Sequence, residues 1–208
     1  MNAAQAARRL IVLGIGIAGA VWFNTSRRPL QHPPGVLTAG DPEQIALSAL
    51  LPSIEKEGWT LRPLAHYFIT ARVLATEHYS WDATAKIAPY DLALGWGPMS
   101  NTAVLERLDV SQSGRYYHWR YWGRPPIPEK EIITHSANTH LIPADDSTAR
   151  AISSLRVGSL VKISGYLVEA THPQADHAWR SSLTRDDEGE GACEIIYVKS
   201  LVELQPAR

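Results

Sequence analysis

The sequence predicts an α+β fold: a small, curled, mostly antiparallel sheet or partial barrel with short helices, preceded by one N-terminal hydrophobic helix. Several segments alternate apolar and polar residues, short segments between them carry helix-capping residues, and one unbroken apolar run lies near the N-terminus. The 208 residues suffice for one domain with an N-terminal extension. We therefore divide the chain into a signal-anchor or transmembrane segment (1–26), a linker (27–40) and a soluble, strand-rich domain (41–208).

The N-terminal run Leu10–Phe23 is apolar without a break, and two arginines flank it on each side. The uncharged stretch continues to Ser26, which puts it at the short limit of the roughly 17 to 25 residues that a spanning helix needs. A cleaved signal peptide, with Ala18-Gly19-Ala20 as its cleavage site, is the alternative. The positive-inside rule does not decide the orientation, because the flanking charges are equal. We expect an uncleaved anchor, and an exported domain in either case.

Within this run, Gly14, Gly16 and Gly19 match the glycine pattern of a dinucleotide-binding turn. That turn needs a long helix after it and a second strand that ends in an acidic residue. Pro29, Pro33 and Pro34 follow instead, and they would interrupt a long helix. The match therefore predicts no dinucleotide site, and we expect no cofactor.

The short segment from Asp41 resembles a helix start, because Asp is a good N-cap and Pro42 suits the first helical position. Ser100 or Asn101 is predicted to cap a second short helix, and Asp145 or Asp146 a third, which ends before Gly158.

Four segments are predicted to be strands, at about 66–79, 115–122, 159–169 and 193–202. The first alternates between an apolar face and a mostly polar one, and Gly165 interrupts the third, where a bend or a close approach is expected. The stretch Val157–Val168 resembles the glycine-bent strand of OB-type and SH3-like barrels. The alternation predicts that one set of aliphatic residues is buried together: Ile69, Val73, Val161, Ile163 and Leu167.

The composition excludes several classes of protein. The net charge of −1 gives no overall electrostatic footprint for nucleic acid, so we expect no nucleic-acid partner. The only cysteine, Cys193, cannot form an internal disulfide, and it is predicted to be a small buried residue at the start of a strand. The pairs His135/His140 and His172/His177 are each five residues apart, so their rings diverge on a helix or a strand, and we expect no metal site.

Three stretches carry more polar and special residues than folding alone requires: Asp91–Ser100, His135–Asp145 and Trp179–Asp187. They resemble the corresponding stretches of a family of uncharacterised, bacterial, N-terminally membrane-anchored envelope proteins. The resemblance extends over nearly the whole soluble domain and implies membrane attachment, without an activity to transfer. Together with the apolar run Leu10–Phe23, it leads us to expect a single-pass protein of the bacterial inner membrane with its soluble domain in the periplasm, or a cleaved, periplasmic protein as second choice.

The candidate binding residues come from these stretches. We expect them to reach one concave surface with a neutral-to-basic floor, and they are Trp96, Asn138, His140, Ser182 and Arg185. The failure of every catalytic template favours a binding or assembly module for a protein or a polar or anionic envelope ligand. The alternative is an envelope hydrolase or transferase, in which His140 with Asp187 or Asp145 supplies acid–base chemistry and Arg185 holds an anionic group.

Overall fold

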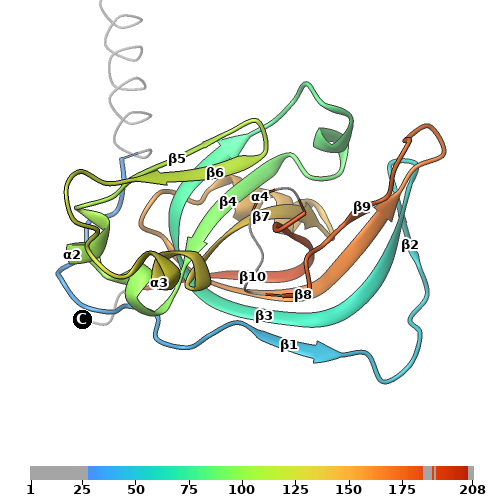
Figure 1. Ribbon diagram of the computed structural model, residues 1–208. Helices are drawn as coiled ribbons and strands as arrows, with labels where there is room; N and C mark the ends of the chain where they lie inside the picture. Colours follow the sequence, from blue (N-terminus) through green and yellow to red (C-terminus); the bar gives the residue numbers. More distant parts are fainter. Residues whose placement is uncertain (1–27, 185–188, 190, 206–208) are drawn as a thin grey trace, which may run out of the picture.

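The computed structural model describes residues 28–184, 189 and 191–205. Over this part the fold is a sheet-rich α+β fold with few helices and a curled, mostly antiparallel sheet (Figure 1). The strands are β1 (Glu43–Ala46), β2 (Ile54–Lys56), β3 (Trp59–His78), β4 (Tyr90–Gly95), β5 (Asp109–Ser113), β6 (Tyr116–Arg120), β7 (Ser136–Pro143), β8 (Leu160–Thr171), β9 (Trp179–Arg180) and β10 (Glu194–Leu204). The helices are α2 (Thr102–Leu105), α3 (Glu129–Thr134) and α4 (Asp146–Ser153), with the 3-10 helices η1 (Ala83–Lys86) and η2 (Gly97–Ser100).

Five strands pair in a closed ring. The order around it is β3, β4, β7, β10, β8 and back to β3, and only the β7–β10 pair is parallel. Strands β1 and β2 add to β3, β9 adds to β8, and β5 and β6 form a separate hairpin. We call these five strands the ring.

Two local features allow the ring to close. The long strand β3 pairs with β8 up to Arg72 and with β4 from Arg72 onward, with a register shift between Val73 and Ala75. Gly165 lies where β8 passes close to β10, because a Cβ atom there would be only 2.0 Å from the carbonyl oxygen of Tyr197. The close approach expected at Gly165 is therefore present.

The main hydrophobic core lies inside the ring. The five aliphatic residues that the alternation predicted to be buried together all belong to this cluster, so that prediction is confirmed. Ile152 and Leu155, from α4 and the segment after it, pack against the same cluster. The side chain of Asp145 accepts a hydrogen bond from the backbone N–H of Thr148 and so caps α4, as expected.

The N-terminal part of the soluble domain differs from the expectation. The residues after Asp41 do not form a helix; Glu43–Ala46 form β1, which pairs with β3. All four residues of β1 are exposed. A short helix at this position would therefore have no apolar face buried against the domain to stabilise it. Ser100 belongs to η2, and Asn101 caps α2. The predicted hydrophobic helix lies outside the described residues, and no helix among the described residues is long and apolar enough to span a membrane.

Candidate functional site

The tip of the β5–β6 hairpin presents an arginine to the ring. The strands end at Ser113 and begin again at Tyr116, so the loop consists of Gly114 and Arg115 alone. Both residues have positive φ values, 58° and 72°, as a two-residue hairpin turn that follows the twist of its strands requires. Glycine adopts this conformation without strain, whereas Arg115 needs stabilising contacts.

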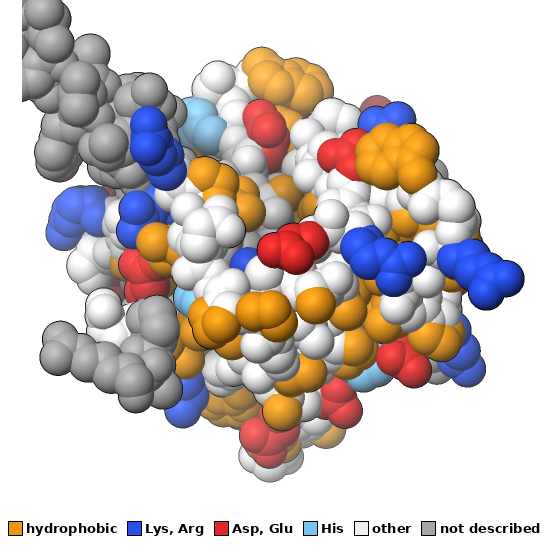
Figure 2. All heavy atoms as spheres, turned by 90° about the vertical axis from the view of Figure 1, so that its left-hand side faces the viewer, with side chains coloured by type: hydrophobic (Ala, Val, Ile, Leu, Met, Phe, Trp, Pro, Cys, Tyr) orange, Lys and Arg blue, Asp and Glu red, His pale blue; other side chains and the backbone are white. Residues whose placement is uncertain are grey.

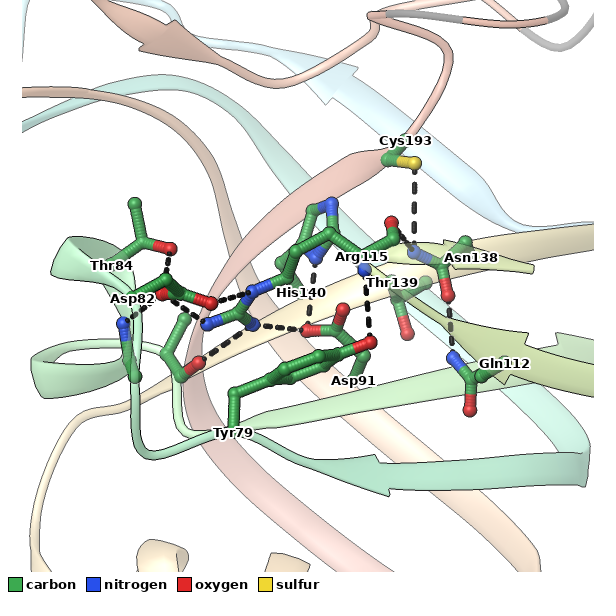
Figure 3. Close-up of polar contacts among 12 residues, drawn as sticks. Tyr79, Asp82, Thr84, Asp91, Gln112, Arg115, Asn138, Thr139, His140 and Cys193 are labelled. Atoms are coloured by element: carbon green, nitrogen blue, oxygen red, sulfur yellow. Dashed lines mark hydrogen bonds and ion pairs between the residues drawn. The ribbon is translucent and has the colours of Figure 1, made fainter.

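Arg115 makes those contacts with the loop between β3 and β4 (Figure 3). Its Nε and Nη2 atoms donate to the two carboxylate oxygens of Asp82, each at 2.9 Å. Its Nη1 atom donates to Oδ1 of Asp91 at 2.7 Å and to the carbonyl oxygen of Ala88 at 2.9 Å. The guanidinium carbon lies 3.9 Å from the ring centroid of Tyr79, and the Tyr79 hydroxyl accepts a hydrogen bond from the backbone N–H of Arg115.

The ion pair between Arg115 and Asp82 stabilises the charged form of both side chains. Burial alone would lower the pKa of Arg115, but hydrogen bonds and attraction from Asp82 and Asp91 outweigh it and raise that pKa. Burial would likewise raise the pKa of Asp82, but the hydrogen bonds from Arg115 and Thr84 together lower it. Arg115 and Asp82 therefore form a charged, bidentate pair that fastens the hairpin to the ring.

His140 joins the same network from β7. Its Nδ1 atom lies 2.9 Å from Oδ1 of Asp91, whose side chain is fully buried. The other oxygen of Asp91, Oδ2, has no hydrogen-bond partner among the described residues. The centroid of the His140 ring lies 4.8 Å from that of Trp179. His140 is thus enclosed between a carboxylate and an indole ring.

A pocket of about 340 Å³ opens beside this network, where β4 ends and β7 and β10 begin. Its walls come from β6, the end of α3, the start of β7 and the segment before β10. The lining residues are Trp96, Tyr116, Tyr117, His118, Trp119, Ile133, Thr134, Ser136, Ala137, Asn138, Thr184, Gly189, Ala192, Cys193 and Glu194. Figure 2 shows the side of the molecule that carries α2 and α3, where hydrophobic side chains lie interspersed among charged and polar ones. A pocket of this size, with aromatic walls and a few polar groups, is typical of small-ligand sites.

The polar groups of the pocket wall hold it in shape. The Tyr117 hydroxyl lies 2.9 Å from the Ser136 hydroxyl, which donates to the carbonyl oxygen of Ile132. Burial raises the pKa of Tyr117 to about 12. The amide nitrogen of Asn138 donates to the carbonyl oxygen of Arg115 and lies 3.6 Å from Sγ of Cys193. The Tyr117–Ser136 and Asn138–Arg115 hydrogen bonds link the hairpin to β7, so the pocket and the hairpin form one unit.

The structure brings two of the five predicted binding residues to this pocket, Trp96 and Asn138. Ser182 lies next to the pocket, because it is hydrogen-bonded to two of the lining residues. Its backbone N–H donates to the carbonyl oxygen of Cys193, and its hydroxyl forms hydrogen bonds with the backbone of Thr184. His140 is not among the lining residues. Arg185 and Asp187 lie outside the described residues.

The floor of the pocket was expected to be neutral to basic. Among the described lining residues, Glu194 carries the only carboxylate, and there is no lysine or arginine. Arg185 follows the lining residue Thr184 directly in the sequence, but it is not described. The described lining is therefore aromatic and mostly uncharged.

The sequence analysis missed Arg115, Asp82 and the covering role of the hairpin. The available signal was Ser-Gly-Arg-Tyr before the aromatic segment at 116–122, since a glycine between two alternating runs marks a hairpin turn. Asp91 was recognised only as part of a special stretch; it lies on β4, next to His140 of β7.

No group of three or more His, Cys, Asp or Glu side chains in the described part of the chain has the geometry of a metal site. Comparison of the chain with protein-family models, curated proteins and solved structures gave no match.

Proposed function

We propose that this protein is a single-pass, membrane-anchored binding module of the bacterial envelope, whose periplasmic domain is an OB-type barrel that holds a ligand in the pocket beside the β5–β6 hairpin. The observation that carries the proposal is the aromatic pocket of about 340 Å³ at the ends of β4, β7 and β10. The membrane anchor is supported by the apolar run Leu10–Phe23 and by the family resemblance of the three polar stretches.

The order of pairing in the ring supports the OB-type assignment. Numbered along the chain, the ring strands are arranged first, second, third, fifth, fourth and back to first, with the third and fifth parallel. A helix, α4, lies between the third and fourth. OB-type barrels bind oligosaccharides and oligonucleotides over their second and third strands, between the loops that join strands one to two and four to five.

The position of the pocket corresponds to that binding face. Asn138 lies on the third ring strand, β7, while Thr184 and Cys193 belong to the connection between the fourth and fifth. The β5–β6 hairpin covers part of the same face, because Arg115 bonds Asp91 on the second strand and Asn138 on the third. The ligand is therefore expected in the pocket beside the hairpin.

An oligosaccharide is the ligand class that the lining favours. Tyr116 and Trp119 are among the aromatic residues that line the pocket, and an aromatic ring offers an apolar face against which a sugar ring can stack. An oligonucleotide would need clustered positive charge along its phosphates, and the chain has a net charge of −1.

The hydrolase alternative has less support among the described residues. Its proposed base, His140, lies against Asp91 and Trp179 rather than in the pocket lining. A general base must come within hydrogen-bond reach of the proton that it removes from the substrate.

The test is a titration of the full-length, detergent-solubilised protein with a soluble oligosaccharide of N-acetylated amino sugars, followed by tryptophan fluorescence. Trp96 and Trp119 line the pocket, so occupation should change their emission saturably. Ala192→Trp fills the pocket from the side of β10 and Thr134→Trp from the side of α3. We expect each to abolish the change at an unchanged melting temperature.

The matched control is Ala175→Trp, an exposed alanine outside the lining, which should bind as the native protein does. Saturable binding of inorganic phosphate without binding of the sugar would overturn the sugar assignment. Binding that persists unchanged in both folded pocket variants would overturn the pocket as the ligand site.

A further inference from the structure

We propose that the end of the domain formed by Arg28–Leu30 and the turn at Arg156–Gly158 rests on the lipid headgroups of the membrane. The occupant of this surface is an anionic bilayer face. The inference rests on the membrane anchorage of the proposed function, and it adds a fixed orientation of the barrel on the membrane.

The first observation is that the segment predicted to be a linker is bonded, from Leu30 onward, to the turn between α4 and β8. The backbone N–H of Leu30 donates to the carbonyl oxygen of Val157 at 2.8 Å. His32 is buried, and its Nε2 atom lies 2.7 Å from the carbonyl oxygen of Gly158. A Cβ atom at Gly158 would lie 2.2 Å from the carbonyl oxygen of Leu30, so the two backbones are in close contact.

The bonding continues along the segment. The Ser100 hydroxyl accepts from the backbone N–H groups of Leu37 and Thr38, and the backbone N–H of Gly97 donates to the carbonyl oxygen of Thr38 at 2.7 Å. The indole N–H of Trp96 donates to Asp41 at 3.1 Å. Contacts at both ends and in the middle hold residues 30–41 on the domain, so this segment does not act as a free tether.

The second observation is the short length of chain left between the apolar run and the docked segment. Five residue steps join Phe23 to Arg28, and a fully extended chain covers about 18 Å in that number. The headgroup layer takes up about 5 to 8 Å of that reach on each side of the bilayer. A domain of this size is roughly 40 Å across, so it cannot turn its far side toward the membrane.

The composition of this end suits an anionic lipid surface. Arg28 is exposed, Arg156 is half-buried, and Arg150 is exposed in the last turn of α4. Val157 is 37% exposed and offers an apolar side chain at the turn. Of the acidic groups nearby, Glu203 is exposed and accepts a hydrogen bond from the Ser159 hydroxyl, so one carboxylate stands against these three arginines, while Asp146 lies at the opposite end of α4. Arginines close to a membrane span attract anionic headgroups.

The experiment places an environment-sensitive fluorophore at one of two positions in the full-length protein, reconstituted in vesicles of phosphatidylglycerol and phosphatidylethanolamine. The single native cysteine is first replaced by Cys193→Ser. Val157→Cys then labels the proposed membrane-facing turn at the start of β8. Ala175→Cys labels an exposed position beyond the far end of β8, whose twelve residues extend over about 40 Å at about 3.3 Å per residue.

A quencher attached to the lipid headgroup should remove most of the fluorescence at position 157 and little at 175. Adding His32→Ala and Ser100→Ala frees the segment, so the two positions should become similar. Equal quenching at both positions in the undisturbed protein would overturn the fixed orientation while leaving the anchor intact. Recovery of the protein outside the vesicles would instead count against the anchor, and thus against the proposed function itself.

Discussion

At the scale of single residues, Arg115 shows how one side chain can fasten a hairpin to a sheet. Its guanidinium bonds Asp82, Asp91 and a backbone carbonyl, and Asp91 is fully buried. Removing the guanidinium therefore takes the arginine from a buried ion pair and leaves only His140 beside the Asp91 carboxylate, and breaking such a pair costs about 3–5 kcal/mol. We expect Arg115→Ala to lower the free energy of unfolding by that amount, measured by urea denaturation. Arg115→Lys should lose less, because it keeps the charge but not the bidentate geometry.

The matched control comes from the same hairpin. Arg120 is exposed, and its Nε atom lies 3.9 Å from the carboxylate of Asp109 on the neighbouring strand. Such surface pairs contribute little, so Arg120→Ala should change the free energy of unfolding by about 0.5 kcal/mol or less. If the Arg115 and Arg120 variants lose equal stability, the network does not hold the hairpin.

At the scale of elements, the contact between β6 and β7 should give the hairpin a distinct dependence on alkaline pH. The pKa of Tyr117 in the folded protein is about 12, above the value of about 10 for an exposed tyrosine. The folded state therefore holds this proton more tightly than the unfolded state does. The resulting stability is complete below pH 10 and is lost as the pH rises toward 12.

Tyr117→Phe removes this phenol, so its free energy of unfolding should fall less between pH 10 and pH 12 than that of the native protein. Tyr116→Phe removes an exposed phenol from the same strand and should keep the native profile. Identical profiles for all three proteins would show that Tyr117 does not couple proton binding to the folding of the hairpin.

The elements also show which parts of this structure the sequence could predict. Strands β3 and β8 alternate over many residues, so their buried face was predictable, and Gly165 correctly indicated a close approach. Local capping residues were enough to place α2 and α4. The strand at Glu43–Ala46 was not predictable, because its four exposed residues gain their conformation from pairing with β3 and not from local preference.

The candidate site was less predictable than the fold for a similar reason. Trp96 and Asn138 come from stretches that were recognised as special, and both line the pocket. Arg115 meets Asp82 and Asp91 only because the hairpin folds back over β4 and β7. Contacts between segments 24 to 33 residues apart depend on the tertiary arrangement, which periodicity along the chain does not encode.

At the scale of the whole molecule, the question is whether the chain stays attached to the membrane. Burial of the apolar run Leu10–Phe23 in hydrocarbon is not screened by salt, whereas binding through surface charges is. We expect the full-length protein to remain in the membrane fraction after a high-salt wash. Ile15→Asp puts a carboxylate near the middle of the run, at a cost of about 2.5–3.5 kcal/mol, and should move protein into the soluble fraction.

The competing outcome is cleavage after Ala18-Gly19-Ala20, which would release a soluble species that begins at Val21. The double substitution Ala18→Leu and Ala20→Leu removes the small residues that cleavage requires, and it makes the run more apolar. If the native protein is anchored, this double variant fractionates as the native protein does. If the native protein is cleaved, it is recovered as the shorter soluble species, and the double variant shifts it into the membrane. Only an uncleaved run keeps Arg28 within about 18 Å of the bilayer core. The N-terminal residue of the mature protein and its fractionation therefore together decide whether the segment that begins at Arg28–Leu30 can hold the domain on a membrane.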